Sequence, residues 1–508
     1  MPSVVGVISK KDEDVSSRLA EMLSTLRYRG PDYAGAVIGN EALFTRGSRP
    51  IDFSGTKGHA AIGYNGLEDD ETIHQPFIDC TGDSFTVLDG RIFNAEQLAE
   101  SLTPHDVDGS VDGEVLTHLL EEEKAADLLS SVSTAMRQLD GVYAFAVMKD
   151  RQVALARDPV GVKPLYWGEN EELFAFASER KALWRVGVKE ATVFPPGHVG
   201  IISSGGRTIS PALTLQKPLP THLELDIAAS KLCEALRKAI KKQIRKVEKI
   251  GVPFSGGVDS SLIVKLADEA GANITLYTVG LEGAYDIEAA EDSASALGLP
   301  LKTRILSTDE VEDRISKVVY AIEEGNQMKV GTGLPLYVVA EEASSNGHRL
   351  LLSGQGSDEL FGGYRRYLRV LRDGGYEELD RELWKDLVKV HEVNLGRDDA
   401  VVAANGLELA APYLDQELIG FATCLPPHLK VENATDPFRK IILRKAAEKV
   451  GLPNKVARLP KKAIQYGSGI DTAILKIAKM YGYEDAKVYL AHVFCKVFKE
   501  FELPALQQ

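Results

Sequence analysis

A short apolar run, Ile250–Phe254, leads directly into a loop of small residues, Ser255-Gly256-Gly257-Val258-Asp259-Ser260-Ser261, and a helical pattern follows. Such a loop forms a cradle for phosphate, because its glycines let the backbone approach the anion while amide N–H groups, hydroxyls and the helix N-terminus attract it. Asp259 adds a hard oxygen ligand of the kind that Mg²⁺ on a polyphosphate prefers. The sequence lacks the Gly-Lys-Ser/Thr of a Walker A loop at the required spacing. A Gly-Ser loop can also simply turn the chain, so the interpretation depends on the other motifs.

The composition is that of a globular protein with two or three domains. The chain has 508 residues, of which 44% are hydrophobic and 26% charged, enough to form large cores. The formal net charge of -15 argues against general nucleic-acid binding, which needs a basic face. The sequence shows no secretory signal pattern and no apolar run of membrane-spanning length. We therefore expect a cytoplasmic protein with no nucleic acid and no membrane among its partners.

Four cysteines, Cys80, Cys233, Cys424 and Cys495, are scattered along the chain. They form no C-x-x-C pair and show no metal-ligand spacing. We therefore expect free, buried thiols in a reducing compartment, rather than disulfides or a zinc site.

Short β-type runs dominate residues 1–205. The clearest of them are Ser3–Ile8, Gly35–Ile38, Ser84–Leu88, Ala144–Met148, Val153–Ala156 and Leu173–Ala177. Helical spacing of apolar residues occurs at Val15–Leu26 and Gly113–Glu123. This mixture predicts an α+β domain of stacked sheets flanked by helices.

Residues 206–224 are rich in Gly, Ser, Thr and Pro and lack periodicity, which predicts a linker. A second domain over residues 225–508 is then expected to open with a long amphipathic helix at Ile227–Val247. Strands alternate with helices after it, which is typical of an α/β fold with a doubly wound parallel sheet, and the last third is largely helical. The predicted strands are Gly251–Phe254, Thr275–Val279 and Leu350–Leu352.

A stripe of large apolar residues near the C-terminus has helical spacing. Its members are Leu490, Val493, Phe494, Val497, Phe498 and Phe501. The stripe predicts core packing or a subunit contact, such as that of a homodimer, rather than a ligand site.

Three more clusters of functional residues accompany the phosphate loop. They are Ser353-Gly354-Gln355-Gly356-Ser357-Asp358-Glu359-Leu360-Phe361-Gly362-Gly363-Tyr364; Gly406-Leu407-Glu408 with Ala411–Asp415; and Lys440–Lys445 with Arg458–Lys462 and Gly467-Ser468-Gly469. In this order the clusters resemble the synthetase domain of the asparagine synthetase family, which includes the β-lactam synthetases. The resemblance covers roughly residues 225–470.

This resemblance implies that ATP and Mg²⁺ bind in the second domain. Asp259 and Asp358 would hold Mg²⁺ on the β- and γ-phosphates, because two carboxylates from separate loops can share a hard cation. Val279 and Gly280 would lie against the adenine, and Lys440 would contact phosphate. The residues expected at the ATP site are Ser255, Gly256, Gly257, Asp259, Ser260, Ser261, Val279, Gly280, Gly354 and Lys440.

The resemblance also implies an acyl-adenylate mechanism. A substrate carboxylate attacks the α-phosphorus and releases pyrophosphate, and an amine then displaces AMP. Lys461 matches the family lysine that stabilises negative charge in the transition state. Glu408 is the candidate general base or amine-positioning group, and Glu323 falls where the family has an acidic residue that holds the substrate amino group.

Two residues depart from the family pattern. Gln355 occupies a catalytic position that is often acidic in asparagine synthetases and tyrosine in β-lactam synthetases, and an amide cannot take up a proton at neutral pH. Ala410 replaces the usual arginine two residues after Glu408. Adenylation remains the expectation, while the identity of the carboxylate stays open.

The first domain resembles the family's glutaminase domain, which implies an Ntn-hydrolase-like αββα fold. The matching segments are Tyr28–Asp32, Leu88–Asn94, Val111–Val115, Leu139–Gly141, Arg157–Asp158, Gly161–Tyr166 and Phe176–Glu179. Fold alone does not carry function, so the catalytic positions decide what this domain can do.

The residues needed for glutamine hydrolysis are replaced. The family begins Met-Cys-Gly, with the cysteine as nucleophile, and this chain begins Met1-Pro2-Ser3. Ala61 stands where an arginine binds the glutamine carboxylate, and Asp89 stands at the oxyanion-hole asparagine, where an anion would repel a developing oxyanion. Only Asp112, which matches a residue that holds the glutamine amino group, remains. We expect an inactive scaffold or interface domain, with a new ligand in the old pocket as the alternative.

Together these features predict an ATP- and Mg²⁺-dependent, AMP-forming carbon–nitrogen ligase. Ammonia-dependent asparagine synthesis from aspartate is the leading case. A β-lactam-synthetase-like ligation, or another ligation that joins a small amine to a different carboxylate, is the alternative. A nucleotide-binding regulator without turnover is a further alternative, and the acidic balance disfavours tRNA modification.

Overall fold

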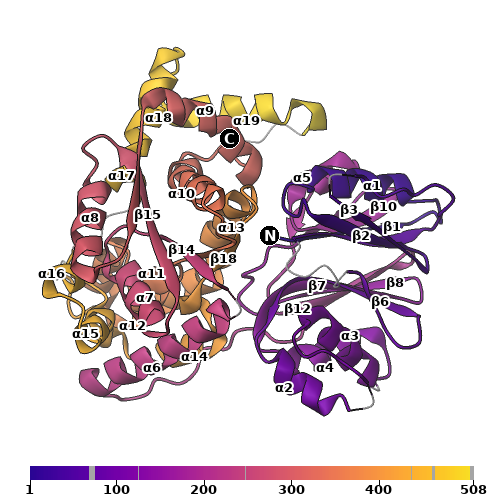
Figure 1. The fold of residues 1–508 in the computed structure, drawn as a ribbon, viewed down its shortest axis with the longest axis horizontal. Coiled ribbons are helices and arrows are strands. Elements are labelled where there is room, and N and C mark those ends of the chain that lie inside the picture. The colour runs from indigo at the N-terminus through magenta and orange to yellow at the C-terminus, as the bar shows by residue number, and fades with distance from the viewer. Residues whose placement is uncertain are drawn as a thin grey trace. The chain divides into compact units, whose positions relative to one another are not determined.

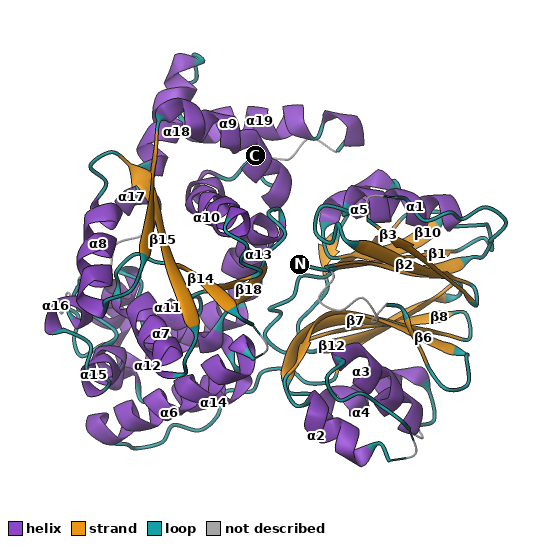
Figure 2. Ribbon diagram, in the orientation of Figure 1, coloured by secondary structure: helices purple, strands orange, loops and turns teal. Residues whose placement is uncertain are grey.

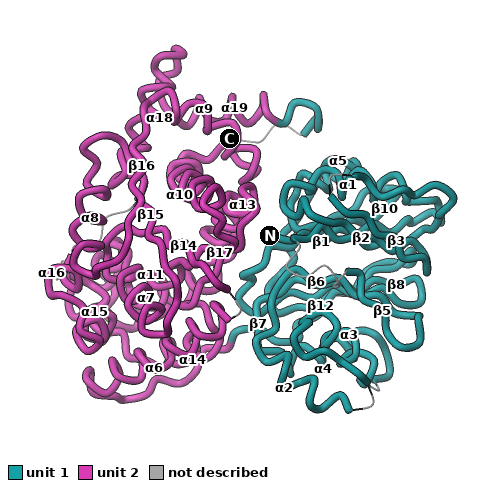
Figure 3. The backbone as a smooth tube through the Cα atoms, in the orientation of Figure 1, with its two compact units in different colours: residues 1–215, 498–508 teal, residues 216–497 magenta. Residues whose placement is uncertain are grey.

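The computed structural model describes residues 1–503 except 48, 68–74, 104, 124, 246, 436–437 and 460–463. Two compact units divide the chain: unit 1 is Met1–Leu215 with Phe498–Gln508, and unit 2 is Gln216–Val497 (Figure 3). In the described part of the chain, no helix combines the length and apolar character needed to cross a membrane.

Two antiparallel sheets form the centre of unit 1. Their strands are β1 (Ser3–Ser9), β2 (Tyr33–Ile38), β3 (Glu41–Arg46), β4 (Ala60–Gly66), β5 (Phe77–Ile78), β6 (Ser84–Ile92), β7 (Gly141–Lys149), β8 (Gln152–Arg157), β9 (Tyr166–Glu169), β10 (Leu173–Ala177), β11 (Thr192–Val193), β12 (His198–Ser203) and β13 (Gly206–Pro211). The strand orders are β11-β9-β10-β1-β4-β2-β3 and β13-β12-β8-β7-β6-β5. All six β-type runs predicted from the sequence lie within these strands.

Strand β13 corrects the predicted linker. The two-residue turn Ser204-Gly205 joins β12 to β13, and Ser203 pairs with Gly206 at the start of the hairpin. Small turn residues therefore marked a hairpin here, and residues 206–211 complete the sheet.

Helices cover both outer faces of the two sheets, which gives unit 1 an αββα architecture (Figure 2). These helices are α1 (Ser16–Thr25), α2 (Ala95–Ser101), α3 (Asp112–Glu122), α4 (Leu128–Gln138) and α5 (Arg180–Arg185), with a short 3-10 turn η4 (Lys499–Phe501). Because side chains alternate along a strand, β1 buries Val4 and Ile8 between the sheets and turns Val5 and Val7 toward α1. Three apolar layers result.

A five-stranded parallel sheet forms the centre of unit 2. Its strands are β14 (Lys249–Pro253), β15 (Asn273–Leu281), β16 (Leu301–Leu306), β17 (Leu350–Leu352) and β18 (Glu408–Ala410). The order β16-β15-β14-β17-β18 reverses direction between β14 and β17. In such a doubly wound sheet, the carboxyl ends of the strands at this switch point form the usual ligand crevice.

Helices surround this sheet (Figure 1). They are α6 (Leu225–Ile244), α7 (Val258–Glu269), α8 (Tyr285–Leu297), α9 (Thr308–Ile322), α10 (Gln327–Ser345), α11 (Ser357–Phe361), α12 (Arg366–Val388), α13 (Gly396–Ala403), α14 (Gln416–Cys424), α15 (Ile441–Lys449), α16 (Asn454–Ala457), α17 (Ile464–Gly467), α18 (Ile470–Met480) and α19 (Ala486–Val497), with single turns η1 (His391–Leu395), η2 (Pro412–Leu414) and η3 (Pro427–Leu429). The predicted α/β fold with a parallel sheet is confirmed.

The end of the apolar C-terminal stripe packs within unit 1. The ring centroids of Phe498 and Phe501 lie 5.2 and 6.1 Å from that of Trp184, and both phenylalanines are buried. Leu490 and Phe494 are buried on α19 of unit 2. These four members therefore serve as core residues, one of the two roles predicted for the stripe.

Candidate active site

The phosphate loop predicted from the sequence lies between β14 and α7. Gly256 has a positive φ of 73°, and a Cβ atom there would lie 2.3 Å from the carbonyl oxygen of Ala289. The hydroxyls of Ser261 and Ser293 donate to the Gly256 carbonyl at 3.3 and 3.1 Å. Only glycine fits this conformation without strain, and the two serines hold the loop against α7 and α8.

The second glycine-rich loop, Ser353–Gly356, follows β17, the neighbour of β14. A Cβ atom on Gly354 would lie 3.4 Å from Cβ of Asp259, so the two loops are in close contact. Asp358 follows on α11. The topological switch point thus brings Asp259 and Asp358 together from segments about 100 residues apart in the chain.

Lys440 lies between these two aspartates. Its Nζ is 2.7 Å from Oδ2 of Asp259 and 2.6 Å from Oδ1 of Asp358, and it donates to the hydroxyl of Ser357 at 3.1 Å. We call Asp259, Asp358 and Lys440 the cleft cluster. The lysine is 2% exposed, whereas the aspartate side chains keep 12% and 17% exposure. The carboxylates therefore remain accessible to a ligand.

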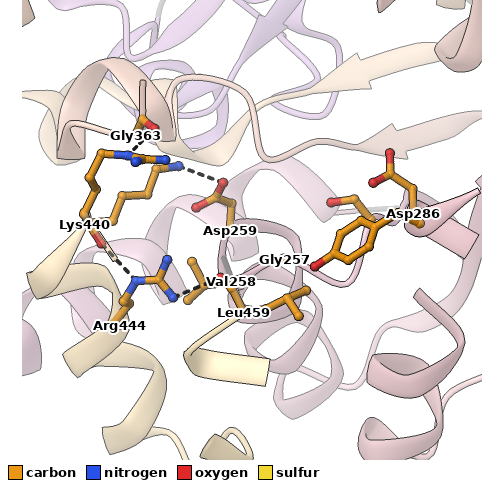
Figure 4. A pocket seen from close by; sticks show the side chains of 11 residues that line it. Gly257, Val258, Asp259, Asp286, Gly363, Lys440, Arg444 and Leu459 are labelled. Carbon is orange, nitrogen blue, oxygen red and sulfur yellow. Dashed lines mark hydrogen bonds and ion pairs between the residues drawn. The ribbon is translucent and has the colours of Figure 1, made fainter. Parts of the chain in front are cut away.

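The cleft cluster borders a cleft with an empty volume of about 470 Å³. Figure 4 shows Lys440 and Arg444 on one side of Asp259 and Asp286 on the other. The lining residues are Ser255, Gly257, Val258, Asp259, Tyr285, Asp286, Gly363, Arg439, Lys440, Arg444 and Leu459. The phosphate loop, cations and carboxylates that share this cleft suit a polyphosphate with a divalent cation.

Two residues hold Lys440 in place. A Cβ atom on Gly363 would lie 1.8 Å from Oδ1 of Asp358 and 2.2 Å from Cε of Lys440, so a larger residue would displace the cleft cluster. Arg444 donates to the carbonyl groups of Arg439 and Leu459 at 2.9 and 3.2 Å. The Arg444 guanidinium thereby joins the backbone before Lys440 to the segment that ends at Leu459.

The donor set fits Mg²⁺. Two carboxylates that converge from separate loops offer the hard oxygen ligands this ion prefers, and substrate phosphates commonly complete its coordination. Asp259 and Asp358 meet this description, and Lys440 lies between them.

Glu359, next to Asp358, is a buried acid that sequence reasoning missed. Burial and then the negative charge of Asp358 raise the pKa of Glu359 to about 7. Tyr364 Oη and Asn394 Nδ2 donate to its Oε1 at 2.5 and 2.8 Å. The sequence shows that Glu359 directly follows Asp358, but it does not show that the Glu359 side chain is buried.

Several of the predicted site residues do not line the cleft. Of the residues that the structure describes, Gln355, Glu323, Glu408, Val279 and Gly280 are not among those lining the cleft. The Gln355 amide donates to Asp398 Oδ2 at 2.5 Å, and Glu323 is buried after the end of α9.

Glu408 lies at the amino end of β18, in register with Leu350 at the amino end of β17. The cleft follows the carboxyl ends of the strands, and a catalytic role for Glu408 stays a prediction. Lys461 lies outside the described residues. The backbone beside Gly280 contacts the predicted Gly-Ser-Gly segment, because Leu281 N donates to the Ser468 carbonyl at 2.8 Å.

Unit 1 contains a buried charged group around Asp89, which we call the interior cluster: Arg29, Asp89, Lys163, Glu179 and Lys181. Asp89 lies 3.7 Å from Arg29 Nη2 and 3.5 Å from Lys163 Nζ. Glu179 accepts from Arg29 Nη1 at 2.7 Å and pairs with Lys181. All five side chains are at most 3% exposed.

Both anions of the interior cluster contact cations, and the cluster holds three cations and two anions. Burial opposes ionisation of Glu179, but Lys181 and Arg29 hold its pKa below the ordinary value. Ala61 packs in an apolar cluster beneath α1, and the Ser3 hydroxyl accepts from Asn65 Nδ2 at 3.1 Å. Asp89 therefore serves as the partner of two buried cations.

Comparison with known proteins agrees with these two halves. The asparagine synthase family model matches residues 231–378 and 372–481, and the glutamine amidotransferase domain model matches residues 1–195. A predicted glutamine-hydrolyzing asparagine synthetase 1 of Methanocaldococcus jannaschii is 34% identical, over 99% of this chain and 100% of that protein. Asparagine synthetase 2 (glutamine-hydrolyzing) of Oryza sativa is 27% identical, over 92% of this chain and 78% of that protein. A glutamine phosphoribosylpyrophosphate amidotransferase structure from B. subtilis is 23% identical, with a TM-score of 0.38, and covers 55% of this chain and 67% of that one.

Proposed function

Because this chain belongs to the asparagine synthetase family of ATP-dependent amide-forming ligases, we propose that it converts aspartate and ammonia to asparagine. ATP is cleaved to AMP and pyrophosphate in this reaction. The observation that carries the proposal is the cleft cluster: Asp259 and Asp358 converge on Lys440 at the mouth of the phosphate loop.

The reaction has two steps. An oxygen of the aspartate side-chain carboxylate attacks the α-phosphorus of ATP, the bond to the bridging oxygen breaks, and pyrophosphate leaves. Ammonia then attacks the acyl carbon of the adenylate, gives up a proton to solvent, and AMP departs as the second leaving group. The groups that hold the polyphosphate in place supply most of the catalysis in such a transfer.

Each residue of the cleft has a role in this scheme. Asp259 and Asp358 would hold Mg²⁺, which when bound neutralises charge on the pyrophosphate leaving group. Lys440 would turn from the aspartates to the phosphates, and the amide groups around Gly257 would donate to them. Lys461 would stabilise charge on the reacting phosphorus, the role the family gives its lysine at this position.

We also propose that the enzyme takes ammonia directly. The named relatives are glutamine-hydrolyzing. In this chain, Ala61 stands where the family has the arginine that binds the glutamine carboxylate, and the anionic Asp89 stands at the oxyanion-hole position. Cys80, the one cysteine of residues 1–215, contacts His105 and His118 at 3.3 and 3.8 Å. The interior cluster stabilises an intact fold in place of a glutamine site.

The test measures pyrophosphate and AMP released from Mg-ATP by the full chain. Aspartate and a panel of other carboxylic amino acids are each supplied with ammonium or with glutamine. We expect turnover with aspartate and ammonium, and asparagine as the product by mass. With glutamine in place of ammonium, the rate should fall to the level without an amine donor.

Each alternative has its own outcome. Turnover with glutamine would overturn the loss of glutaminase chemistry. Turnover with another carboxylate, but not with aspartate, would indicate the β-lactam-synthetase-like alternative. ATP binding without AMP formation under every condition would favour a nucleotide-binding regulator.

A further inference from the structure

A second group of reactive side chains lies in unit 1, outside both charged clusters. Cys80 is on the loop between β5 and β6, His105 is on the loop after α2, and His118 and Glu121 lie one turn apart on α3. One sulfur, two nitrogens and one carboxylate oxygen of these residues all lie within 4.8 Å of one another. Three separate segments converge on this point.

Three of four distances between the candidate ligand atoms match the edges of a metal-centred tetrahedron, and the fourth, from Glu121 Oε2 to His118 Nδ1, is about 0.3 Å shorter than such an edge. Cys80 Sγ is 3.3 Å from His105 Nδ1 and 3.8 Å from His118 Nδ1. Glu121 Oε2 is 3.0 Å from His118 Nδ1 and 3.8 Å from His105 Nδ1. Zinc bonds to sulfur, nitrogen and oxygen place neighbouring ligand atoms about 3.3–3.8 Å apart.

The surrounding contacts also resemble those of metal-binding histidines. Nε2 of His105, the nitrogen that does not face the group, lies 2.9 Å from Oε1 of Glu122. A carboxylate on the second ring nitrogen is the usual support of a metal-bound imidazole, because it fixes the ring and the tautomer. Asp79 accepts from the backbone N–H groups of Asp83 and Ser84 at 3.0 and 3.2 Å, which shapes the loop that carries Cys80.

We propose that Cys80, His105, His118 and Glu121 bind one zinc ion in a tetrahedral structural site. Four protein ligands complete the coordination, which is typical of structural zinc, whereas catalytic zinc keeps a position for water. A thiolate with two imidazoles favours zinc over magnesium or calcium. The expectation of buried thiols is wrong for Cys80 and Cys495, which are exposed, and the proposal departs from the expectation that the cysteines bind no metal. It does not depend on the function of unit 2.

The proposed binding of zinc exchanges one proton for the metal ion. Zn²⁺ displaces the proton of the Cys80 thiol, which passes to solvent, while the carboxylate and the two neutral imidazoles bind without releasing protons. No oxidant or reductant takes part. The ion would fasten the β5–β6 loop and the α2–α3 connection to α3, at the edge of the second sheet.

The experiment uses the untagged full chain, purified without chelator and analysed for metals. The protein is then stripped with EDTA, dialysed and titrated with Zn²⁺ against a chromophoric chelator, and in parallel with Co²⁺. We expect one zinc per chain, the intense absorption of tetrahedral Co²⁺ with a thiolate charge-transfer band, and a higher melting temperature when zinc is present.

Variants identify the ligands. C80S and H118A should lose the tight site and the zinc-dependent rise in melting temperature, whereas C495S, which removes an exposed thiol in unit 2, should keep both. E122Q changes a side chain that is 39% exposed and should weaken zinc binding about 10- to 100-fold while leaving the stoichiometry at one.

Two results would overturn the proposal. One is a wild-type chain that takes up no zinc at stoichiometric concentration. The other is a C80S variant that binds zinc as tightly as the wild type. If C80S or H118A fails to fold by circular dichroism, the E122Q affinity decides, because an unchanged affinity there would contradict a site that includes His105.

Discussion

The two charged clusters differ in solvent exposure and in charge pairing, although each pairs aspartates or glutamates with lysine or arginine. The interior cluster is closed, since every side chain in it is at most 3% exposed and its anions already contact cations. The cleft cluster is open on one side, where two aspartates share a single lysine beside an empty volume of about 470 Å³. The anions of the interior cluster are already paired with cations, whereas the carboxylates of the cleft cluster can still bind a ligand.

This difference agrees with the proposed function, in which unit 2 carries the chemistry and the interior cluster of unit 1 has a structural role. A buried ion pair that already satisfies its charges gains nothing from a substrate and loses much if one partner is removed. An open pair of carboxylates on a cleft repel each other and gain from a cation. Replacing an aspartate of the cleft cluster should therefore lower the reaction rate, whereas replacing one of the interior cluster should lower the free energy of unfolding.

The largest effect is expected from Asp358→Asn in the cleft cluster. Removing one of the two charged oxygen ligands should lower the rate of aspartate-dependent pyrophosphate release about 10³-fold, with little change in melting temperature. Asp292→Asn, on an exposed turn of α8, is the matched control and should retain the wild-type rate. A rate within threefold of wild type for Asp358→Asn would show that the cleft cluster is not the ATP site.

Asp89→Asn in the interior cluster should act on stability instead. It removes the carboxylate charge that pairs with the buried Lys163 and Arg29, and loss of one partner of a buried ion pair costs about 3–5 kcal/mol of unfolding free energy. The same change at Asp12, whose ion pair with Arg151 is 63% exposed on both sides, should cost about 0–1 kcal/mol. Urea unfolding measures both.

The same variant tests the proposed loss of glutaminase chemistry. The substitution restores the asparagine that the family has at the oxyanion position, yet Ala61 still offers no clamp for the glutamine carboxylate. The folded fraction of Asp89→Asn should therefore release no ammonia from glutamine. Ammonia release would contradict the structural role assigned to Asp89.

The sequence predicted what lies close together in the chain and missed what the tertiary structure assembles. The phosphate loop could be located because strand, glycines and aspartate are consecutive from Ile250 to Ser261. The bridge from Lys440 to both aspartates could not, since it joins residues 82 and 181 positions apart through strand order. The same limit applies to Cys80 and His105, whose separation of 25 residues matches no ligand spacing.

Residues that were assigned by comparison with the family pattern were harder still to interpret from the sequence. The charge of Asp89 predicted an impaired oxyanion hole, but only the structure identifies Arg29 and Lys163 as its partners. Glu408 matched the family motif, and the structure adds that it begins the three-residue strand β18 in register with Leu350. Motif matching gives a residue's neighbours along the chain, whereas its position in the sheet depends on where the strand begins.

The pKa values of Glu359 and Glu179 differ in a way that predicts how stability depends on pH. Both are buried, but Glu179 contacts cations that lower its pKa, whereas the pKa of Glu359 is raised to about 7 from an ordinary 4.5. The folded state then binds a proton that the unfolded state releases between pH 4.5 and 7. Stability from Glu359 is fully present below pH 4.5 and is lost as the pH rises to 7, by about 3 kcal/mol.

Glu359→Gln checks this contribution. The amide keeps an oxygen for Tyr364 and Asn394 but cannot titrate, so the decrease in unfolding free energy between pH 4.5 and 7 should be smaller by that amount. Wild-type and variant urea curves that run parallel across this range would contradict the raised pKa.

The smallest effect is expected where a neutral group supports the cleft cluster. The buried Tyr413 hydroxyl donates to the backbone carbonyl of Asp259 at 3.1 Å. Tyr413→Phe should cost about 1 kcal/mol of unfolding free energy, the net value of one hydrogen bond, and raise KM for ATP less than about threefold, because the helix still holds Asp259. Tyr376→Phe removes a similar bond to the carbonyl of Glu432 from a side chain that is 40% exposed, and should cost less than about 0.5 kcal/mol. A large loss of activity in Tyr413→Phe with unchanged stability would mean that the hydroxyl acts on the substrate itself, and the cleft cluster would then need a fourth member.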